Sequence, residues 1–282
     1  MEIIETIKDL KIYINDLQKK QVKIGFVPTM GFLHEGHLSL MRKARADNDF
    51  LAISIFVNPI QFGAGEDYAE YPRDLERDIE LAESTDCGLI FVPPVREMYP
   101  TGYSTFVTVE NLTNTLCGIS RPDHFRGVST IVTKLFNLVC PDRAYFGQKD
   151  AQQAIILKRM TSDLNMGLEL IILPTIRESD GLAMSSRNKY LGVEERKEAT
   201  LIYKSLVETE ELIRKGMTDP KELIYNIKAI LSYAKTGIID YIEIVDSEKL
   251  QPVEKVAGRC LVAIAMKFGI TRLIDNIIVE AE

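Results

Sequence analysis

Residues 23–40 read KIGFVPTMGFLHEGHLSL, and this stretch decides the fold. It opens with an apolar run of strand length, passes through a turn that contains proline and glycine, and continues with apolar residues at helical spacing. A helix that begins directly after a strand presents free backbone N–H groups and a partial positive charge at its first turn. The stretch therefore predicts a strand, turn and helix whose turn is suited to a phosphate group.

The same alternation continues to about residue 174. Nearly all-apolar runs alternate with amphipathic stretches, which is typical of parallel strands covered on both faces by helices. We therefore predict an α/β fold, a Rossmann-like doubly wound parallel sheet. The predicted strands are residues 23–27, 50–57, 88–92, 143–146 and 168–173, and the predicted helices are residues 1–20, 37–46, 74–84, 128–139 and 150–163.

After residue 177 the pattern changes to two long charged helices followed by closely spaced strand-like runs. Such runs favour a small antiparallel sheet. The sequence thus predicts two domains, residues 1–176 with the Rossmann-like sheet and residues 177–282 as a smaller α+β C-terminal domain. Its predicted helices are residues 193–215 and 220–236, and its predicted strands are residues 239–245, 259–267 and 272–279.

Composition excludes several classes of protein. The 282 residues carry 34 basic and 41 acidic side chains, a net charge of −7, so a broad basic surface for nucleic acid is not expected. No apolar run approaches the ~20 residues that span a bilayer, and no membrane partner is expected. The four cysteines lack zinc-site spacing and are predicted to be buried thiols. Together with an N-terminus unlike a secretory signal, they predict a cytoplasmic protein.

Histidine is scarce, and two of the three histidines lie in the turn that follows the first predicted strand. His34 and His37 are three residues apart, so both imidazoles can face one ligand. The alternatives are that they cap the helix or bind a metal ion. Neither a carboxylate set nor a third histidine lies nearby in the sequence to complete a catalytic zinc site.

Two further loops follow predicted strands or precede predicted helices. Asn58 and Gln61 offer neutral amides that suit hydroxyl and carboxylate groups of a small substrate, although an Asn-Pro turn alone would explain Asn58. Arg121, in a loop with Arg126 and His124, adds positive charge that could hold a carboxylate or phosphate. The alternative for that loop is a solvated basic turn.

Two later segments are also suited to a polyphosphate. Lys149 follows the fourth predicted strand, where a mobile ammonium can reach phosphate oxygens. Asp150 can cap the next helix or accept from a ribose hydroxyl, and Gln153 can share their face. Residues 181–188 form a glycine-containing loop that ends in two serines and an arginine, either a lid over phosphates or a linker between domains.

These motifs resemble a known family. The H-x-G-H element of His34–His37 resembles the nucleotidylyltransferase superfamily, and residues 28–40 as a whole resemble the pantothenate synthetase family. Residues 181–188 look like the K-M-S-K-S loop of the superfamily, with Arg187 in place of its lysine. The motifs occur in the family's order across residues 25–191, and Asp123 stands where the family commonly has glycine.

The resemblance implies ATP-dependent ligation of pantoate and β-alanine to pantothenate through pantoyl adenylate, with release of AMP and pyrophosphate. It also implies Mg²⁺, a homodimer and a C-terminal domain that acts as a lid. His34, His37 and Lys149 are the implied catalytic residues. The implied pantoate contacts are Gln61, Gln153, Asn58 and Arg121, and the implied ATP contacts are Met30, Gly31, Phe32, Leu33, His34, Glu35, Gly36, His37, Gly147, Gln148, Lys149, Asp150, Ile176, Met184, Ser185, Ser186 and Arg187.

Some alternatives stay open at this point. The protein ligand of Mg²⁺ is unknown, and Asp78 is a weak candidate whose alternative is a place on a solvated helix face. Another nucleotidylyltransferase, one that transfers a nucleotide to a phosphate, would need cations where this chain has Asn58, Gln61 and Gln153. A non-catalytic nucleotide sensor should have lost a charged motif, whereas both histidines, Lys149 and Arg187 are present.

Overall fold

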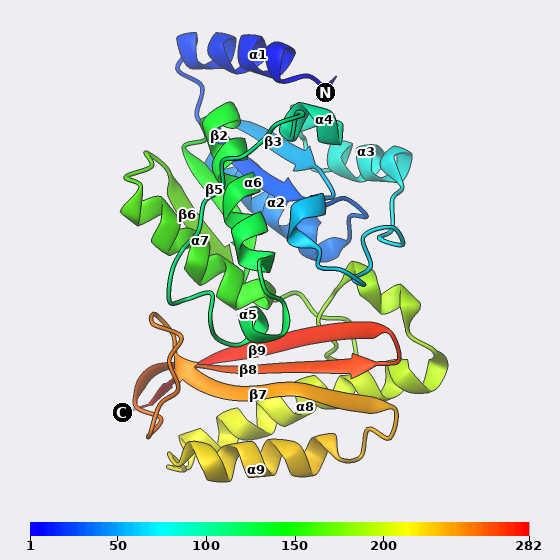
Figure 1. Ribbon diagram of the computed structural model, residues 1–282, viewed down its shortest axis with the longest axis vertical. Helices are drawn as coiled ribbons and strands as arrows, with labels where there is room; N and C mark the ends of the chain where they lie inside the picture. The colour runs from blue at the N-terminus through cyan, green and yellow to red at the C-terminus, as the bar shows by residue number, and fades with distance from the viewer. Residues whose placement is uncertain (282) are drawn as a thin grey trace. The chain divides into compact units, whose positions relative to one another are not determined.

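The computed structural model describes residues 1–281, which divide into two compact units (Figure 1). The first unit comprises Met1–Glu110, Arg121–Gly147 and Ile156–Pro174, and the second comprises Asn111–Ser120, Gln148–Ile155 and the chain from Thr175 onward. The main division thus lies two residues before the predicted 176/177 boundary. The sequence did not indicate that two short internal stretches join the second unit.

The first unit is built on a six-stranded sheet whose pairings are all parallel. The strand order is β1-β4-β3-β2-β5-β6, so the chain runs outward from β2 to one side first and then to the other. This order confirms the predicted Rossmann-like doubly wound fold, and its switch point lies between β2 and β5. The strands are β1 Glu2–Ile4, β2 Ile24–Thr29, β3 Phe50–Ile55, β4 Leu89–Phe91, β5 Arg143–Gly147 and β6 Glu169–Leu173.

Helices flank this sheet (Figure 1). They are α1 Ile7–Lys19, α2 Glu35–Asp47, α3 Leu75–Glu83, α4 Val95–Met98, α6 His124–Val139 and α7 Ala151–Asp163, with short 3₁₀ turns η1 Pro59–Gln61 and η2 Gln148–Asp150. The core between strands and helices is fully buried, as Val27, Leu51, Ile53, Met41 and Ile90 have no exposed surface. Helix α7 begins within the second unit and continues in the first.

The first residues of the chain differ from the prediction. A helix over residues 1–20 is wrong for Glu2–Ile4, which form the edge strand β1 paired in parallel with β4. Helix α1 begins only at Ile7, because the Thr6 hydroxyl caps it by accepting from the Asp9 N–H. Apolar residues at positions 3 and 4 are compatible with a helix or a strand. Their pairing with β4 makes them a strand.

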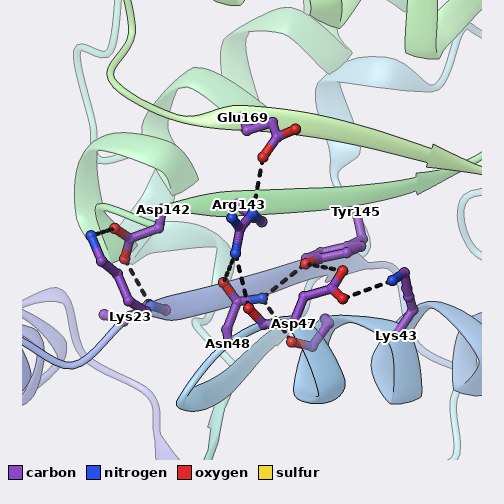
Figure 2. Close-up of polar contacts among 10 residues, drawn as sticks. Lys23, Lys43, Asp47, Asn48, Asp142, Arg143, Tyr145 and Glu169 are labelled. Carbon is purple, nitrogen blue, oxygen red and sulfur yellow. Dashed lines mark hydrogen bonds and ion pairs between the residues drawn. The ribbon is translucent and has the colours of Figure 1, made fainter.

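A polar cluster fixes the carboxyl end of α2 to the amino end of β5 (Figure 2). The Tyr145 hydroxyl accepts from Asn48 Nδ2 at 2.8 Å and donates to Asp47 Oδ2 at 3.0 Å. Arg143 Nη1 donates to the Asp47 carbonyl at 2.9 Å, and its Nε donates to Glu169 at 2.9 Å. Burial raises the pKa of Tyr145 to about 12, which keeps the phenol a donor. These contacts lie at the amino ends of the strands, whereas the loops that carry the predicted site follow the carboxyl ends.

The second unit is a smaller α+β structure, as predicted. Helices α8 Val193–Arg214 and α9 Pro220–Leu231 accompany an antiparallel sheet in the order β7-β8-β9, formed by Gly237–Asp246, Gly258–Phe268 and Thr271–Ala281. Helix α9 ends five residues before its predicted end. The short helix α5 Cys117–Ser120 also belongs to this unit. Its core includes Leu206, Leu223, Ile227, Ile264 and Phe268, all fully buried.

The cysteines correct one prediction. Cys87, Cys117 and Cys260 are buried free thiols, but Cys140 is exposed. Cys140 ends α6 in a left-handed conformation with φ of 45°, which turns the chain out of the helix at the surface. Within the described chain, no helix has the length and apolar character needed to cross a membrane.

Candidate active site

The turn between β2 and α2 is held by its two histidines. His34 is the N-cap of α2, and its Nδ1 accepts from the Gly36 N–H at 3.2 Å. His37 Nδ1 accepts from the His34 N–H at 3.3 Å, and the two ring centroids are 4.1 Å apart. The capping role considered from the sequence is therefore present.

Capping also determines what the imidazoles can do. An imidazole nitrogen that accepts a hydrogen bond carries no proton, so the neutral ring carries its proton on the other nitrogen. With Nδ1 of His34 and of His37 turned to backbone N–H groups, each Nε2 is a hydrogen-bond donor. Two adjacent donors at the positive end of a helix suit an anionic oxygen.

A buried carboxylate supports the same turn. Asp78, on α3 and 1% exposed, accepts from the N–H groups of Phe32 and Leu33, each at 2.7 Å. Its predicted alternative, a solvated helix face, is wrong, because tertiary packing brings α3 against the turn. Burial raises the pKa of Asp78 and the two N–H donors offset this in part. At Gly31, with φ of +81°, a Cβ would lie 2.9 Å from the Asp78 carboxylate, so only glycine fits.

Gln61 and Asn58 lie next to this turn in the first unit. Asn58 is 1% exposed, and its Nδ2 donates to Gln61 Oε1 at 3.0 Å. Gln61 Nε2 contacts the thioether sulfur of Met30, a residue of the turn, at 3.1 Å. The structure therefore brings the predicted pantoate residue Gln61 together with the predicted ATP residue Met30.

Arg121 lies on the other side of Gln61. Its Nε and Nη2 donate to the two carboxylate oxygens of Glu66 at 2.7 and 2.5 Å, and its Nη2 lies 3.5 Å from the Gln61 carbonyl. His124 Nδ1 is 2.8 Å from the same carbonyl. Arg121 and His124 thus hold the backbone at Gln61, and direct contact of Arg121 with a substrate remains a prediction.

The second unit carries the turn that contains Lys149. Lys149 Nζ lies 3.7 Å from Asp150 Oδ1, and the Lys149 side chain is one-fifth exposed. Asn276 of β9 donates from Nδ2 to the carbonyls of Gln148 at 3.0 Å and Lys149 at 2.9 Å. In the first turn of α7, Gln152 is 7% exposed and its side-chain oxygen accepts from the Cys117 N–H at 3.0 Å. The Lys149 turn is therefore fixed through its backbone.

The loop that begins at Thr175 is also fixed within the second unit. Met184 N–H donates to the Ile176 carbonyl at 3.0 Å, and Ser185 caps the 3₁₀ turn Ser186–Tyr190 (η3) by accepting from the Arg187 N–H at 3.3 Å. Arg177 pairs with Asp275 through two contacts of 2.5 and 3.1 Å. Ile176 and Met184 are therefore paired through their backbones, and Ser185, Ser186 and Arg187 follow at the start of η3.

Two residues with a structural part in these turns were missed by the sequence reasoning. Asp275 and Asn276 are consecutive on β9 and each is 4% exposed. One holds Arg177 at the start of the loop, and the other holds the turn at Lys149. The available signal was a buried-strand pattern over residues 272–279 interrupted by two polar side chains, which a strand tolerates only where they have partners.

A doubly wound parallel sheet whose strand β2 leads through H-x-G-H into helix α2 defines the nucleotidylyltransferase-like class of α/β proteins. The family model described as Pantoate-beta-alanine ligase matches residues 2–278. The chain belongs to this family and is a ligase.

Relatives resemble it over nearly their whole length. The pantothenate synthetase of Acetivibrio thermocellus is 58% identical over 280 residues, which cover 99% of this chain and 100% of that protein. The crystal structure of pantothenate synthetase from Thermus thermophilus superposes with a TM-score of 0.94 at 44% identity, covering 98% of this chain and 99% of that one. The Francisella tularensis pantoate-β-alanine ligase, complexed with β-γ ATP and β-alanine, has a TM-score of 0.80 at 36% identity, covering 98% and 97%.

Proposed function

We propose that this chain condenses pantoate with β-alanine at the expense of ATP in two steps. A carboxylate oxygen of pantoate attacks the α-phosphorus of ATP, and pyrophosphate leaves as pantoyl adenylate forms. The amine of β-alanine then attacks the adenylate carbonyl, and pantothenate, AMP and a proton are produced. The first step is needed because a carboxylate has no good leaving group, whereas its adenylate releases AMP.

The observation that carries this proposal is the pair of Nε2 donors that the caps of His34 and His37 define. We assign them to the phosphate oxygens, where they stabilise the negative charge that grows in the transition state of adenylate formation. The partial positive charge at the N-terminus of α2 would add to this stabilisation. The proposed ATP contacts here are Met30, Gly31, Phe32, Leu33, Glu35 and Gly36.

Cationic and hydroxyl side chains of the second unit are also proposed to bind ATP. Lys149 and Arg187 would neutralise the β and γ phosphates, and Ser185 and Ser186 would donate hydrogen bonds to them. A fixed turn supports this role for Lys149, because Asn276 holds the carbonyls of Gln148 and Lys149. Gly147, Asp150, Ile176 and Met184 complete the proposed ATP contacts.

Gln61 and Gln153 are the proposed contacts of pantoate, which they would orient for attack on the α-phosphorus. Asn58 and Arg121 are proposed to act at the same subsite. Their internal partners support a role in holding Gln61, through its side chain and its carbonyl respectively.

Mg²⁺ is proposed to enter as part of the substrate, Mg-ATP. No group of three His, Cys, Asp or Glu side chains within residues 1–281 is placed to hold a metal ion. The Asp78 carboxylate is occupied by two backbone N–H groups. Coordination mainly by phosphate oxygens and water fits the preferences of the ion.

The homodimer and the cytoplasmic location are also proposals, which rest on the family resemblance and on the free thiols. For a chain of 31.9 kDa, light scattering on the purified protein should give a mass about twice that value. A mass equal to one chain at micromolar concentration would contradict the homodimer.

The test of the function is an assay with defined substrates. Purified protein with ATP, pantoate and β-alanine should form AMP, and AMP formation should require both organic substrates. ATP and pantoate alone should release pyrophosphate in an amount limited by the enzyme. ATP binding without turnover would favour the nucleotide sensor, and nucleotide transfer to a phosphate substrate would favour another nucleotidylyltransferase.

A further inference from the structure

The orientation of the Gln61 side-chain amide is determined by Asn58. Asn58 Nδ2 has two hydrogens, and it donates them to Gln61 Oε1 at 3.0 Å and to the Gly127 carbonyl at 3.1 Å. Because Gln61 Oε1 is an acceptor in this contact, the Nε2 end of the amide faces away from Asn58. Nε2 touches the Met30 sulfur, a weak acceptor, at 3.1 Å. Gln61 is thereby arranged to act toward a substrate as a hydrogen-bond donor.

The Asn58 amide needs a partner at its oxygen as well. That partner is Tyr99, whose hydroxyl donates to Asn58 Oδ1 at 2.8 Å. Asn58 is 1% exposed, so water does not replace this donor freely. Without the Tyr99 hydroxyl, Oδ1 is buried and unpaired, and rotation of the amide to recover a hydrogen bond would release Gln61.

Packing holds the Tyr99 ring in place. Tyr99 lies against Phe56, with ring centroids 6.2 Å apart, and against Tyr103, with centroids 5.0 Å apart. The Lys134 ammonium of α6 lies 5.6 Å from the Tyr99 centroid and 4.6 Å from that of Tyr103. A cation within about 6 Å of a ring centroid is attracted to the ring, which helps to hold both rings in place. Burial raises the pKa of Tyr99, so the hydroxyl keeps its proton.

We propose that Tyr99 is a positioning residue for pantoate, acting through Asn58 to turn Gln61 so that Nε2 donates to an oxygen of pantoate. Tyr99 follows the short helix α4 and is distant in sequence from Asn58, so no sequence motif links them. All of the residues in this chain of contacts belong to the first unit. The inference rests on the proposed function.

The test compares Tyr99→Phe with Tyr103→Phe in steady-state assays. Tyr99→Phe keeps the ring but removes the hydroxyl, and it should raise the KM for pantoate about tenfold, the effect of one lost hydrogen bond. The KM for ATP should stay within about twofold. Tyr103→Phe is the matched control, because the Tyr103 hydroxyl has no hydrogen-bond partner in the described residues 1–281, and it should leave both constants unchanged.

A double-mutant cycle separates positioning from general damage. In an Asn58→Ala background, Tyr99→Phe should have no further effect on the KM for pantoate, because the contact through which it acts is gone. Equal effects of Tyr99→Phe in both backgrounds, or a lowered melting temperature with an unchanged KM, would overturn the inference. A wild-type protein that does not consume pantoate would overturn the proposed function instead.

Discussion

At the scale of single residues, side chains in the candidate site do two kinds of work. His34 and His37 cap a helix with Nδ1, and this same contact sets Nε2 as the donor. Asp78 does not need to touch a ligand, because it fixes the N–H groups of Phe32 and Leu33. Capping and ligand binding were alternatives in the sequence, and the structure makes them compatible.

Lys149 gives the most direct test at this scale. Lys149→Ala should lower the rate of pyrophosphate release from ATP and pantoate by about 10²- to 10³-fold, because a charge that stabilises the transition state is removed. The melting temperature should change little, since the fixed part of this turn is its backbone. Lys158→Ala, an exposed lysine of α7, is the matched control. Near-normal pyrophosphate release by Lys149→Ala would contradict the assigned role.

The ion pair between Glu66 and Arg121 should make the free energy of unfolding depend on pH. Burial alone would raise the pKa of Glu66, but the hydrogen bonds and charge of Arg121 outweigh it and hold the pKa below its usual value. A lowered pKa in the folded state means that the pair stabilises the fold above the unfolded pKa of about 4.3. This contribution is lost as the pH falls through the lower folded pKa.

Denaturant unfolding of wild type and Glu66→Gln measures this contribution. The wild type should be more stable by about 1–3 kcal/mol near neutral pH, and the difference should shrink as the pH is lowered below about 4. A constant difference over this range would show that Glu66 does not titrate with the predicted lowered pKa.

At the scale of elements, the approach of α6 to η1 depends on one glycine. A Cβ at Gly127 would lie 2.5 Å from the Ile60 carbonyl oxygen and 2.7 Å from the Gln61 Cα and N. These are backbone atoms, which cannot move aside as a flexible side chain can. The distance between α6 and the segment that carries Gln61 is therefore limited by the residue at position 127.

Gly127→Ala should lower the free energy of unfolding by about 1–3 kcal/mol through this overpacking, and it should raise the KM for pantoate because Gln61 shifts. Gly167→Ala is the control, since a Cβ there meets no atom within 4 Å. Its free energy of unfolding should stay within about 0.5 kcal/mol of wild type. An unchanged KM in a destabilised Gly127→Ala protein would show that the approach of α6 matters for folding only.

At the scale of the whole molecule, the burial of each cysteine within the two units predicts which thiols react. The thiolate is the reactive form of cysteine, and burial raises the pKa of Cys87 to about 12 and also raises the pKa of Cys260. Cys117 is buried as well, and Cys140 is exposed. In the native protein one thiol should therefore react quickly with a disulfide reagent, and four should react in denaturant.

Mass spectrometry after brief labelling identifies the modified residue. Cys140→Ser should abolish the fast reaction of the native protein, and three thiols should still react in denaturant. Fast labelling of Cys87 or Cys260 in the native wild type would contradict the burial of these thiols in the two cores.

The sequence by itself determined the doubly wound sheet, the α+β second unit and the motifs of the family. Each depends on local patterns, the apolar period of a strand or helix and the order of residues in a turn. It could not assign β1, because a short edge strand depends on its neighbour β4. It also gave no notice that residues 111–120 and 148–155 join the second unit, since only contacts across long sequence separations define a unit.

Tertiary structure alone decided the residues that support the site. Asp78 reaches the turn after β2 across 45 residues of chain, Asn276 reaches Lys149 across 127, and Tyr99 reaches Asn58 across 41. A buried polar group pairs with the partner that the folded chain brings to it. The spacing of residues in the sequence does not identify that partner. The sequence motifs therefore predict which chemical groups form the candidate site, whereas residues distant in the sequence determine how those groups are oriented.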